Sequence, residues 1–137
     1  MSSWKVDLGE ARARFQGEIL LDEPLSKHTY YRIGGPAEAL VFPRNIQDLE
    51  FLGEFIRTHR PEVFILGQGS NLLVADEGFE GLVIRMSKFD LTIEPAGEGL
   101  VRTGSGVVVS SFLRRCGVEG WGGLEILGGI PGSMGGV

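Results

Sequence analysis

Three glycine-rich stretches contain the residues of this chain that are best suited to hold a ligand. They are Arg32-Ile33-Gly34-Gly35, Gly67-Gln68-Gly69-Ser70-Asn71 and residues 128–136. Glycine lets the backbone approach a ligand without a Cβ atom in the way, and successive amides in tight turns form concave sites for anions. Each stretch taken alone has the simpler interpretation of an ordinary turn. The three together favour a phosphate-binding site.

Ser70 and Asn71 add uncharged polar groups to the second stretch. A hydroxyl and an amide can hydrogen-bond to a phosphate or a ribose without carrying charge. Two known nucleotide patterns do not fit, because Leu72 stands where the Rossmann pattern requires its third glycine and the lysine of a P-loop is absent. The residues alone therefore predict a nucleotide-diphosphate binder that uses dipoles rather than lysine.

The familiar patterns of catalytic and metal sites do not occur in the sequence. His28 and His59 lack the spacing of metal ligands, and no G-x-S-x-G, H-E-x-x-H or C-x-x-C is found. We interpret both histidines as surface or packing residues, and the single cysteine, Cys116, as a small hydrophobic residue of a helix. These observations argue against a hydrolase and against a metal site.

Length and charge limit the remaining classes. With 137 residues, the chain has the usual size of one domain. Its formal charge of −5 and its scattered lysines and arginines argue against binding to a nucleic-acid backbone. The N-terminal residues are too charged for a signal peptide, and no segment reaches the roughly 18 apolar residues of a membrane span. We expect a cytoplasmic protein without a nucleic-acid or membrane partner.

The glycine stretches alternate with segments that have strand or helix patterns. Residues 37–42 are apolar apart from Glu38 and are enclosed by prolines, which predicts a strand. Asn45 can cap the helix that follows, whose apolar spacing continues to about Arg60. Residues 63–66 then predict a buried strand that runs directly into Gly67. This strand, helix, strand, glycine-loop order is a βαβ-like unit.

The other expected elements are shorter. We expect an amphipathic helix over residues 5–18, a connecting segment over 24–29, short strands at 72–74 and 82–84, a hairpin of 91–93 with 100–103, and a helix over 107–116.

The glycine stretches and their flanks closely resemble motifs of the UDP-N-acetylenolpyruvoylglucosamine reductases. The matching segments are His28-Thr29-Tyr30-Tyr31-Arg32-Ile33-Gly34-Gly35-Pro36-Ala37, Leu66-Gly67-Gln68-Gly69-Ser70-Asn71-Leu72-Leu73 and Gly128-Gly129-Ile130-Pro131-Gly132-Ser133-Met134-Gly135-Gly136. All three stand in the order of the family, and residues 76–84 between them also resemble a strand and turn of that family. The joint match is specific, although no single loop would be.

The resemblance implies an α+β fold, the FAD-binding domain of the vanillyl-alcohol-oxidase type, with a βαβ-like subdomain followed by a second mixed β/α subdomain. Residues 28–137 would form this domain, and residues 1–27 an N-terminal extension. FAD would be held non-covalently, with its pyrophosphate against the glycine loops and residues 67–72 as the main cradle. The implied FAD-binding residues are Arg32, Ile33, Gly34, Gly35, Leu66, Gly67, Gln68, Gly69, Ser70, Asn71, Leu72, Gly128, Gly129, Ile130, Pro131, Gly132, Ser133, Gly135 and Gly136.

The resemblance also implies a reaction. The family passes a hydride from NADPH to FAD and then to the enolpyruvyl group of UDP-N-acetylglucosamine enolpyruvate, which gives UDP-N-acetylmuramate for peptidoglycan. A serine protonates the carbanion, and a glutamate and an arginine bind the carboxylate. The family pattern places these three residues and the substrate domain beyond Val137. We therefore expect a domain that is incomplete at its C-terminal end, and we assign no catalytic residue.

Two alternatives stay open at this point. The chain could belong to another FAD-linked oxidoreductase of the same fold, or it could be a stand-alone module that binds a flavin or a nucleotide without chemistry. The segments Arg32-Ile33-Gly34-Gly35 and residues 129–136 favour the reductase.

Overall fold

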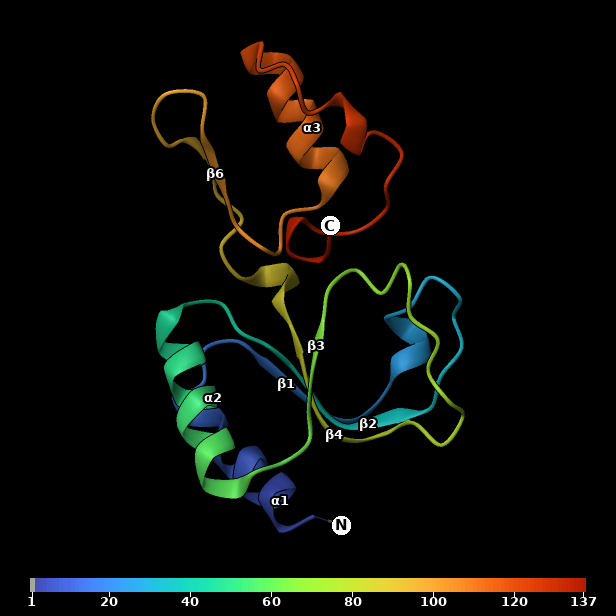
Figure 1. Cartoon of the computed structure of the whole chain (residues 1–137). Helices are drawn as coiled ribbons and strands as arrows, with labels where there is room; N and C mark the ends of the chain where they lie inside the picture. Colours follow the sequence, from blue (N-terminus) through green and yellow to red (C-terminus); the bar gives the residue numbers. More distant parts are fainter. Residues whose placement is uncertain (1) are drawn as a thin grey trace.

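A four-stranded mixed sheet organises the first part of the chain. In the computed structural model, which describes residues 2–137, the strands lie in the order β1 (Glu18–Pro24), β2 (Pro36–Phe42), β4 (Phe79–Arg85) and β3 (Val63–Leu66) (Figure 1). The first pair is antiparallel and the other two pairs are parallel. A second, smaller lobe follows the sheet and lies at the other end of the molecule (Figure 1).

The two central strands form the most buried part of the sheet. Residues 39–41 of β2 and 82–84 of β4 are uninterrupted apolar runs, and Leu40 lies opposite Val83 in the parallel ladder. Parallel strands that are covered on both faces have such continuous apolar sequences. The strands predicted at residues 37–42 and 82–84 are thus confirmed.

Helix α2 (Ile46–His59) connects β2 to the parallel edge strand β3. Asn45 begins it as predicted, because its side chain accepts a hydrogen bond of 2.9 Å from the backbone N–H of Asp48. The helix ends at His59, and the next residue, Arg60, adopts the left-handed conformation with φ 49°. The predicted strand, helix, strand order is therefore present.

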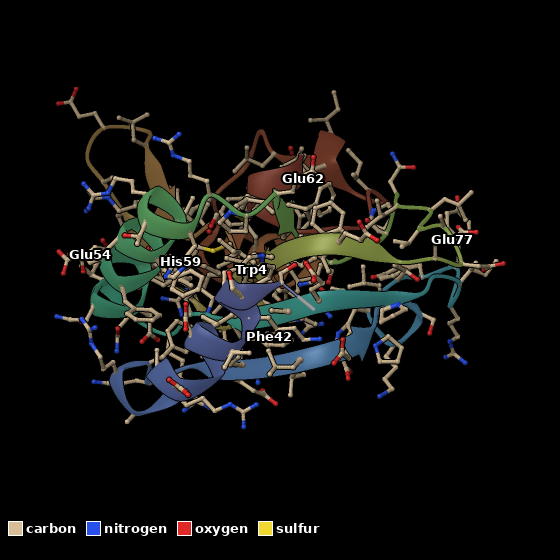
Figure 2. All side chains as sticks on the ribbon, turned by 90° about the horizontal axis from the view of Figure 1, so that it is seen from below. Trp4, Phe42, Glu54, His59, Glu62 and Glu77 are labelled. Atoms are coloured by element: carbon tan, nitrogen blue, oxygen red, sulfur yellow. The ribbon has the colours of Figure 1, made fainter. Side chains whose placement is uncertain are left out.

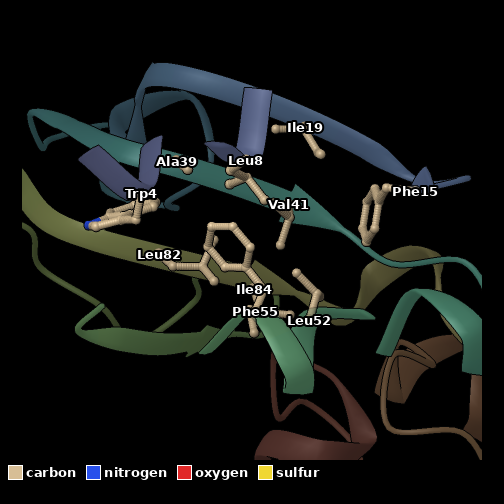
Figure 3. Close-up of a cluster of buried hydrophobic side chains, with 10 residues drawn as sticks. All are labelled: Trp4, Leu8, Phe15, Ile19, Ala39, Val41, Leu52, Phe55, Leu82 and Ile84. Atoms are coloured by element: carbon tan, nitrogen blue, oxygen red, sulfur yellow. The ribbon is translucent and has the colours of Figure 1, made fainter. Parts of the chain in front are cut away.

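Both faces of the sheet carry a hydrophobic core. On one face, α1 (Ser3–Glu10) and α2 pack on the strands through ten buried side chains, including Leu8, Leu52 and Leu82 (Figure 3). On the opposite face a second cluster includes Leu40, Phe42, Leu66 and Val83. Alternate residues of β2 and β4 thus supply the two cores, as the pleat of a strand requires.

The N-terminal residues differ from the expected helix over 5–18. Helix α1 ends at Glu10, a 3-10 turn η1 (Ala11–Arg14) follows, and residues 18–24 form the edge strand β1. Residues 1–27 were expected as an extension, yet this segment supplies a strand to the sheet and Trp4 to the core. The Trp4 ring meets Phe55 edge-on at 6.3 Å, and Figure 2 shows Trp4 near the centre of the view, on the N-terminal helix.

The second lobe consists of a hairpin and a helix. Strands β5 (Ile93–Pro95) and β6 (Val101–Thr103) are antiparallel, and α3 (Val109–Glu119) packs beside them through Phe112 and Cys116. The predicted hairpin is present, although its first strand lies at 93–95 instead of 91–93. The predicted helix and the packing of Cys116 in it are confirmed. The remaining short turns are η2 (Leu25–Lys27), η3 (Met86–Lys88), η4 (Glu125–Leu127) and η5 (Met134–Gly136). Within residues 2–137, no helix has the length and apolar character required to cross a membrane.

The strand expected at residues 72–74 does not form. This segment is irregular because it packs against another part of the chain instead of a neighbouring strand. The Ala75 carbonyl accepts hydrogen bonds from the N–H groups of Gly35 and Gly78, at 2.9 and 3.0 Å. Apolar character alone therefore did not distinguish a strand from a packed turn here.

A buried carboxylate fixes the start of α2. Asp48 is 1% exposed, and its two carboxylate oxygens accept hydrogen bonds of 2.8 Å from the N–H groups of Gln16 and Arg44. It thereby ties the residues before β1 and after β2 to the first turn of the helix.

We expect Asp48→Ala to lower the free energy of unfolding by about 3 kcal/mol, because a hydrogen bond to a charged group contributes roughly 1.5–3 kcal/mol. Urea denaturation measures this change. Glu50→Ala, on the exposed side of the same helix, is the matched control and should change stability by less than about 0.5 kcal/mol. Equal losses in the two variants would contradict the assigned role.

Candidate functional site

A cavity of about 490 Å³ opens where strand β3 ends, at the junction of the two lobes. Two loops form it: loop 67–71, which follows β3, and loop 128–136, near the C-terminus (Figure 1). Its volume lies in the range of roughly 300–1,000 Å³ typical of small-molecule sites. The lining residues are Phe64, Ile65, Leu66, Gly67, Gln68, Gly69, Ser70, Asn71, Leu72, Ile130, Pro131, Gly132, Ser133, Gly136 and Val137.

Loop 67–71 is held by the segment that precedes β2. The Tyr30 N–H donates a hydrogen bond of 2.9 Å to the Gly69 carbonyl. Gly69 has φ +67°, and a Cβ atom at this position would lie 2.1 Å from the His28 carbonyl oxygen. Any other residue would therefore be strained and would collide with backbone. Glycine is required at position 69 by the packing of the protein itself.

Loop 128–136 is held by the start of α3. The Val109 N–H donates to the Gly132 carbonyl at 3.0 Å, and the Met134 N–H donates to the Val107 carbonyl at 2.8 Å. Gly132 has φ +137°, a conformation that side-chain-bearing residues avoid. These bonds fix the loop to the second lobe.

The two loops touch each other. The Ser70 hydroxyl donates a hydrogen bond of 3.2 Å to the Pro131 carbonyl. A Cβ atom added at Gly67 would lie 2.8 Å from Oγ of Ser133. The structure thus brings two of the three predicted stretches together, although about 60 residues separate them in the sequence.

Loop 67–71 presents a run of backbone donors. Within residues 2–137, no protein atom accepts a hydrogen bond from the N–H groups of residues 67–71, nor from those of Gly132 and Ser133. Buried backbone donors almost always have a partner, and Gly69, Gly132 and Ser133 are buried. Successive amides of this kind form an anion site.

The lining of the cavity carries no charged side chain. No lysine, arginine, aspartate or glutamate belongs to the residues that border it. A negative group bound there would be held by backbone and side-chain dipoles, with charge-assisted hydrogen bonds from the amides. The donor set and the bare glycine backbone therefore fit a nucleotide diphosphate.

A neighbouring cavity of about 310 Å³ shares the residues Ile130, Pro131 and Gly132 with the first. Its other walls include Tyr30, Gly129 and the start of α3. The backbone at 130–132 is therefore bordered by hollow space on two sides. An elongated ligand could contact this segment along its length.

The segment Arg32-Ile33-Gly34-Gly35 does not border either cavity. Gly34 has φ +134°, and a Cβ atom there would lie 2.6 Å from Cβ of Val74. A Cβ atom at Gly35 would lie 2.1 Å from the carbonyl oxygen of Asp76. These glycines allow close packing against residues 74–78, so a direct contact of this segment with a cofactor stays a prediction.

Gly128, Gly129 and Gly135 also lie outside the lining of the 490 Å³ cavity. Gly128 donates its N–H to the Glu125 carbonyl at 2.9 Å, and a Cβ atom at Gly135 would lie 2.8 Å from Cβ of Ser105. Gly129 borders only the neighbouring cavity among those described. Their contact with a cofactor is likewise a prediction.

Sequence reasoning missed the contribution of Phe64 and Ile65. The strand predicted at residues 63–66 is confirmed as β3, but its predicted burial is wrong, because β3 is the edge strand of the sheet and, among the described residues, pairs only with β4. Phe64 and Ile65 are 38% and 59% exposed and border the cavity. A short apolar run looks the same in a central strand and in an edge strand, so the sequence held no signal for this difference.

A charged network lies behind loop 67–71. The His28 side chain is 13% exposed, its Nε2 lies 3.0 Å from Oε1 of Glu23, and its Nδ1 lies 2.6 Å from a guanidinium nitrogen of Arg85. His28 was interpreted as a surface or packing residue, but both its ring nitrogens have polar partners. His59 stacks on Phe55 at 4.3 Å, as expected of a packing residue, and its Nδ1 lies 3.6 Å from Oδ2 of Asp7.

The network shifts two pKa values. Burial alone would raise the pKa of Glu23, but hydrogen bonds from His28 and Lys27, together with the charge of Lys27, outweigh it and hold the pKa below its ordinary value. Burial lowers the pKa of the Arg85 guanidinium, and the charge of Tyr30 acts in the opposite direction. Nε of Arg85 is buried and has no hydrogen-bond partner among the described residues.

Two curated proteins similar to this chain carry the same name. The UDP-N-acetylenolpyruvoylglucosamine reductase of Caulobacter sp. (strain K31) is 40% identical over 136 residues, which is 98% of this chain and 42% of that protein. The protein of the same name from Pelobacter propionicus is 37% identical over 121 residues, or 88% of this chain and 41% of that protein. The chain thus spans about two fifths of the length of these relatives. The predicted resemblance is confirmed.

A solved structure agrees with the sequence relatives. The UDP-N-acetylenolpyruvylglucosamine reductase (MurB) from Thermus caldophilus matches with a TM-score of 0.62 and 32% identity, over 88% of this chain and 40% of that one. The predicted fold class is confirmed by this match. The model of the family described as "FAD binding domain" matches residues 37–137, which is most of the chain. The chain therefore belongs to the FAD binding domain family.

Proposed function

We propose that this chain is the FAD-binding part of an NADPH-dependent reductase, which converts UDP-N-acetylglucosamine enolpyruvate to UDP-N-acetylmuramate in the cytoplasm. The observation that carries the proposal is the run of unpartnered amides at residues 67–71, in an uncharged cavity of a chain of the FAD binding domain family. The names of the relatives support the substrate and the reaction.

The residues of this chain would bind and orient the cofactor. Backbone amides of residues 67–71 would hold the pyrophosphate, and the Asn71 side chain can donate to phosphate or ribose oxygens. The Ser70 hydroxyl donates to the Pro131 carbonyl and can still accept from a ribose hydroxyl. Pro131 fixes its own φ and would keep the wall at residues 130–133 rigid. When bound, FAD supplies the chemistry of hydride transfer from NADPH to the substrate. Residues 28–137 would form the FAD-binding unit, to whose sheet β1 adds an edge strand.

We assign no part of the proton chemistry to the described residues. Protonating a carbanion requires a positioned acid, and binding a carboxylate requires a cationic clamp. The cavity has no charged side chain, and Arg32 does not border it. Ser70 already donates to Pro131, so it is assigned to binding.

The first test is cofactor binding by the protein expressed from its complete gene. We expect the visible spectrum of oxidised flavin, with FAD binding at least about tenfold more tightly than FMN, because FMN lacks the pyrophosphate that the amides would hold. Adding NADPH should bleach the flavin, and UDP-N-acetylglucosamine enolpyruvate should restore its colour.

Three results would count against the proposal. Equal affinity for FMN would contradict the pyrophosphate site, and a colourless protein that does not take up FAD would contradict cofactor binding. Bleaching by NADPH without restoration of colour by the substrate would instead indicate another FAD-linked oxidoreductase of the same fold.

The second test narrows the gap between the two loops. Gly67→Ala places a Cβ atom against Oγ of Ser133, and we expect FAD affinity to fall by about tenfold, which corresponds to ~1.4 kcal/mol. Combining it with Ser133→Ala removes the close oxygen and should recover most of the affinity. Isothermal titration with FAD measures both effects.

Gly117→Ala is the matched control, because a Cβ atom at this position of α3 has open space around it. Gly69→Val is less informative, since a side chain there collides with backbone and disturbs the fold as well as the site. Unchanged affinity in Gly67→Ala would show that the cofactor does not lie between the two loops.

A further inference from the structure

The network of Glu23, His28 and Arg85 joins the sheet to loop 67–71. Arg85 lies opposite Leu66 in the β3–β4 ladder, directly before the loop begins. The His28 carbonyl lies against Gly69, and two residues later Tyr30 donates its N–H to the Gly69 carbonyl. A movement of the His28 ring would therefore be transmitted to loop 67–71 through the backbone of residues 28–30.

The hydrogen bonds define the charge state of His28. A guanidinium has only donors, so the Nδ1 atom that faces Arg85 at 2.6 Å must be an acceptor. The ring proton is then on Nε2 and is donated to the Glu23 carboxylate at 3.0 Å. The observed geometry requires neutral His28. A second proton on Nδ1 would place two donors against each other.

Charged groups from several elements surround the ring. Glu23 of β1 faces Nε2, and Lys27 of η2 lies 3.4 Å from the same carboxylate. Arg85 of β4 faces Nδ1, and Tyr30, in the loop before β2, interacts with the Arg85 charge. Lys88 of η3 belongs to the same surroundings.

Three of these basic side chains lie near the Phe42 ring. The Lys88 ammonium lies 4.7 Å and the Arg85 guanidinium 5.9 Å from its centre, and the His28 ring lies 5.9 Å from it. A protonated His28 would thus add positive charge beside two existing cations. Two acids belong to these surroundings in the part of the chain that the structure describes: Glu18 pairs with Lys88 at 2.6 Å, and Glu23 faces the His28 ring itself.

We propose that His28 is a positioning residue, which holds loop 67–71 in its FAD-binding conformation only while its ring is neutral. The inference rests on the proposed function, in which this loop binds FAD. Protonation of His28 at acid pH separates it from Arg85, shifts residues 28–30 and weakens the support of Gly69. FAD binding then weakens as the pH falls.

The acid partner does not titrate in the same range. The pKa of Glu23 lies below its ordinary value, so its carboxylate stays ionised, and its stabilising contribution is lost only at still lower pH. Histidine is the side chain that changes charge between about pH 5 and 8. A change of affinity within that interval is therefore not due to Glu23, and the His28→Gln variant decides whether it depends on His28.

The experiment measures the Kd for FAD between about pH 8 and pH 5.5, with the protein expressed from its complete gene. We expect the affinity of the unsubstituted protein to fall by about tenfold across this range, as one charge-assisted hydrogen bond is lost. His28→Gln keeps one donor and one acceptor but cannot be protonated, so it should bind at pH 8 and lose most of the pH dependence. His28→Leu should bind weakly at every pH.

His59→Gln is the matched control, because His59 stacks on Phe55 of the opposite core and its substitution should leave the pH profile unchanged. Arg85→Gln provides a second route if His28→Leu does not fold. The glutamine amide can still donate to Nδ1 of His28, but it carries no charge that would repel a protonated ring. The FAD affinity of this variant should therefore depend less on pH. Circular dichroism at each pH confirms that the variants are folded.

The outcomes separate the two proposals. The same pH profile in His28→Gln as in the unsubstituted protein, or full affinity in His28→Leu, would overturn the positioning role. A steep profile in Arg85→Gln would do the same. Failure of the unsubstituted protein to bind FAD at any pH would overturn the proposed function, and the inference with it.

Discussion

The contact between Gly69 and residues 28–30 is the constraint on which the site depends. The position of loop 67–71 is set by one backbone hydrogen bond and by a carbonyl that leaves no room for a Cβ atom. This contact determines where the chain turns after β3, and therefore which amides remain without partners. The sheet fixes the start of the loop, because the β3–β4 pairing continues as far as Leu66 and Arg85.

The second lobe completes the site rather than forming one of its own. Its loop 128–136 is fixed to α3 by backbone hydrogen bonds, and it reaches the first lobe through Ser70 and Pro131. A protein with a net charge of −5 can still bind an anion in this way, because aligned amides act over short distances and need no cationic side chain. The same design leaves the cavity without acid or base groups, which fits a role in holding a cofactor.

Local patterns predicted much of this architecture. The proline-enclosed run of β2, the Asn45 cap of α2 and the glycines after β3 each have a local physical cause, so the sequence was sufficient to predict them. Strand β1 was missed because its residues Glu18–Pro24 alternate little between polar and apolar. Its strand conformation comes from pairing with β2, which is a tertiary effect.

The site was predicted in part for the same reason. Glycine content marked loops 67–71 and 128–136, but it could not separate glycines that border a cavity from glycines that permit backbone packing, such as Gly34 and Gly35. The exposed side chains of β3 and the polar partners of His28 depend on residues far away in the sequence. No local pattern records such contacts.

The central claim is that two loops from different lobes enclose the pyrophosphate of FAD. A structure of the protein with FAD bound tests it most directly. We predict pyrophosphate oxygens within hydrogen-bonding distance, about 2.7–3.2 Å, of several backbone nitrogens of residues 67–71. The backbone at residues 130–133 should lie within about 4 Å of the cofactor. A cofactor bound elsewhere, with both loops beyond that distance, would contradict the account.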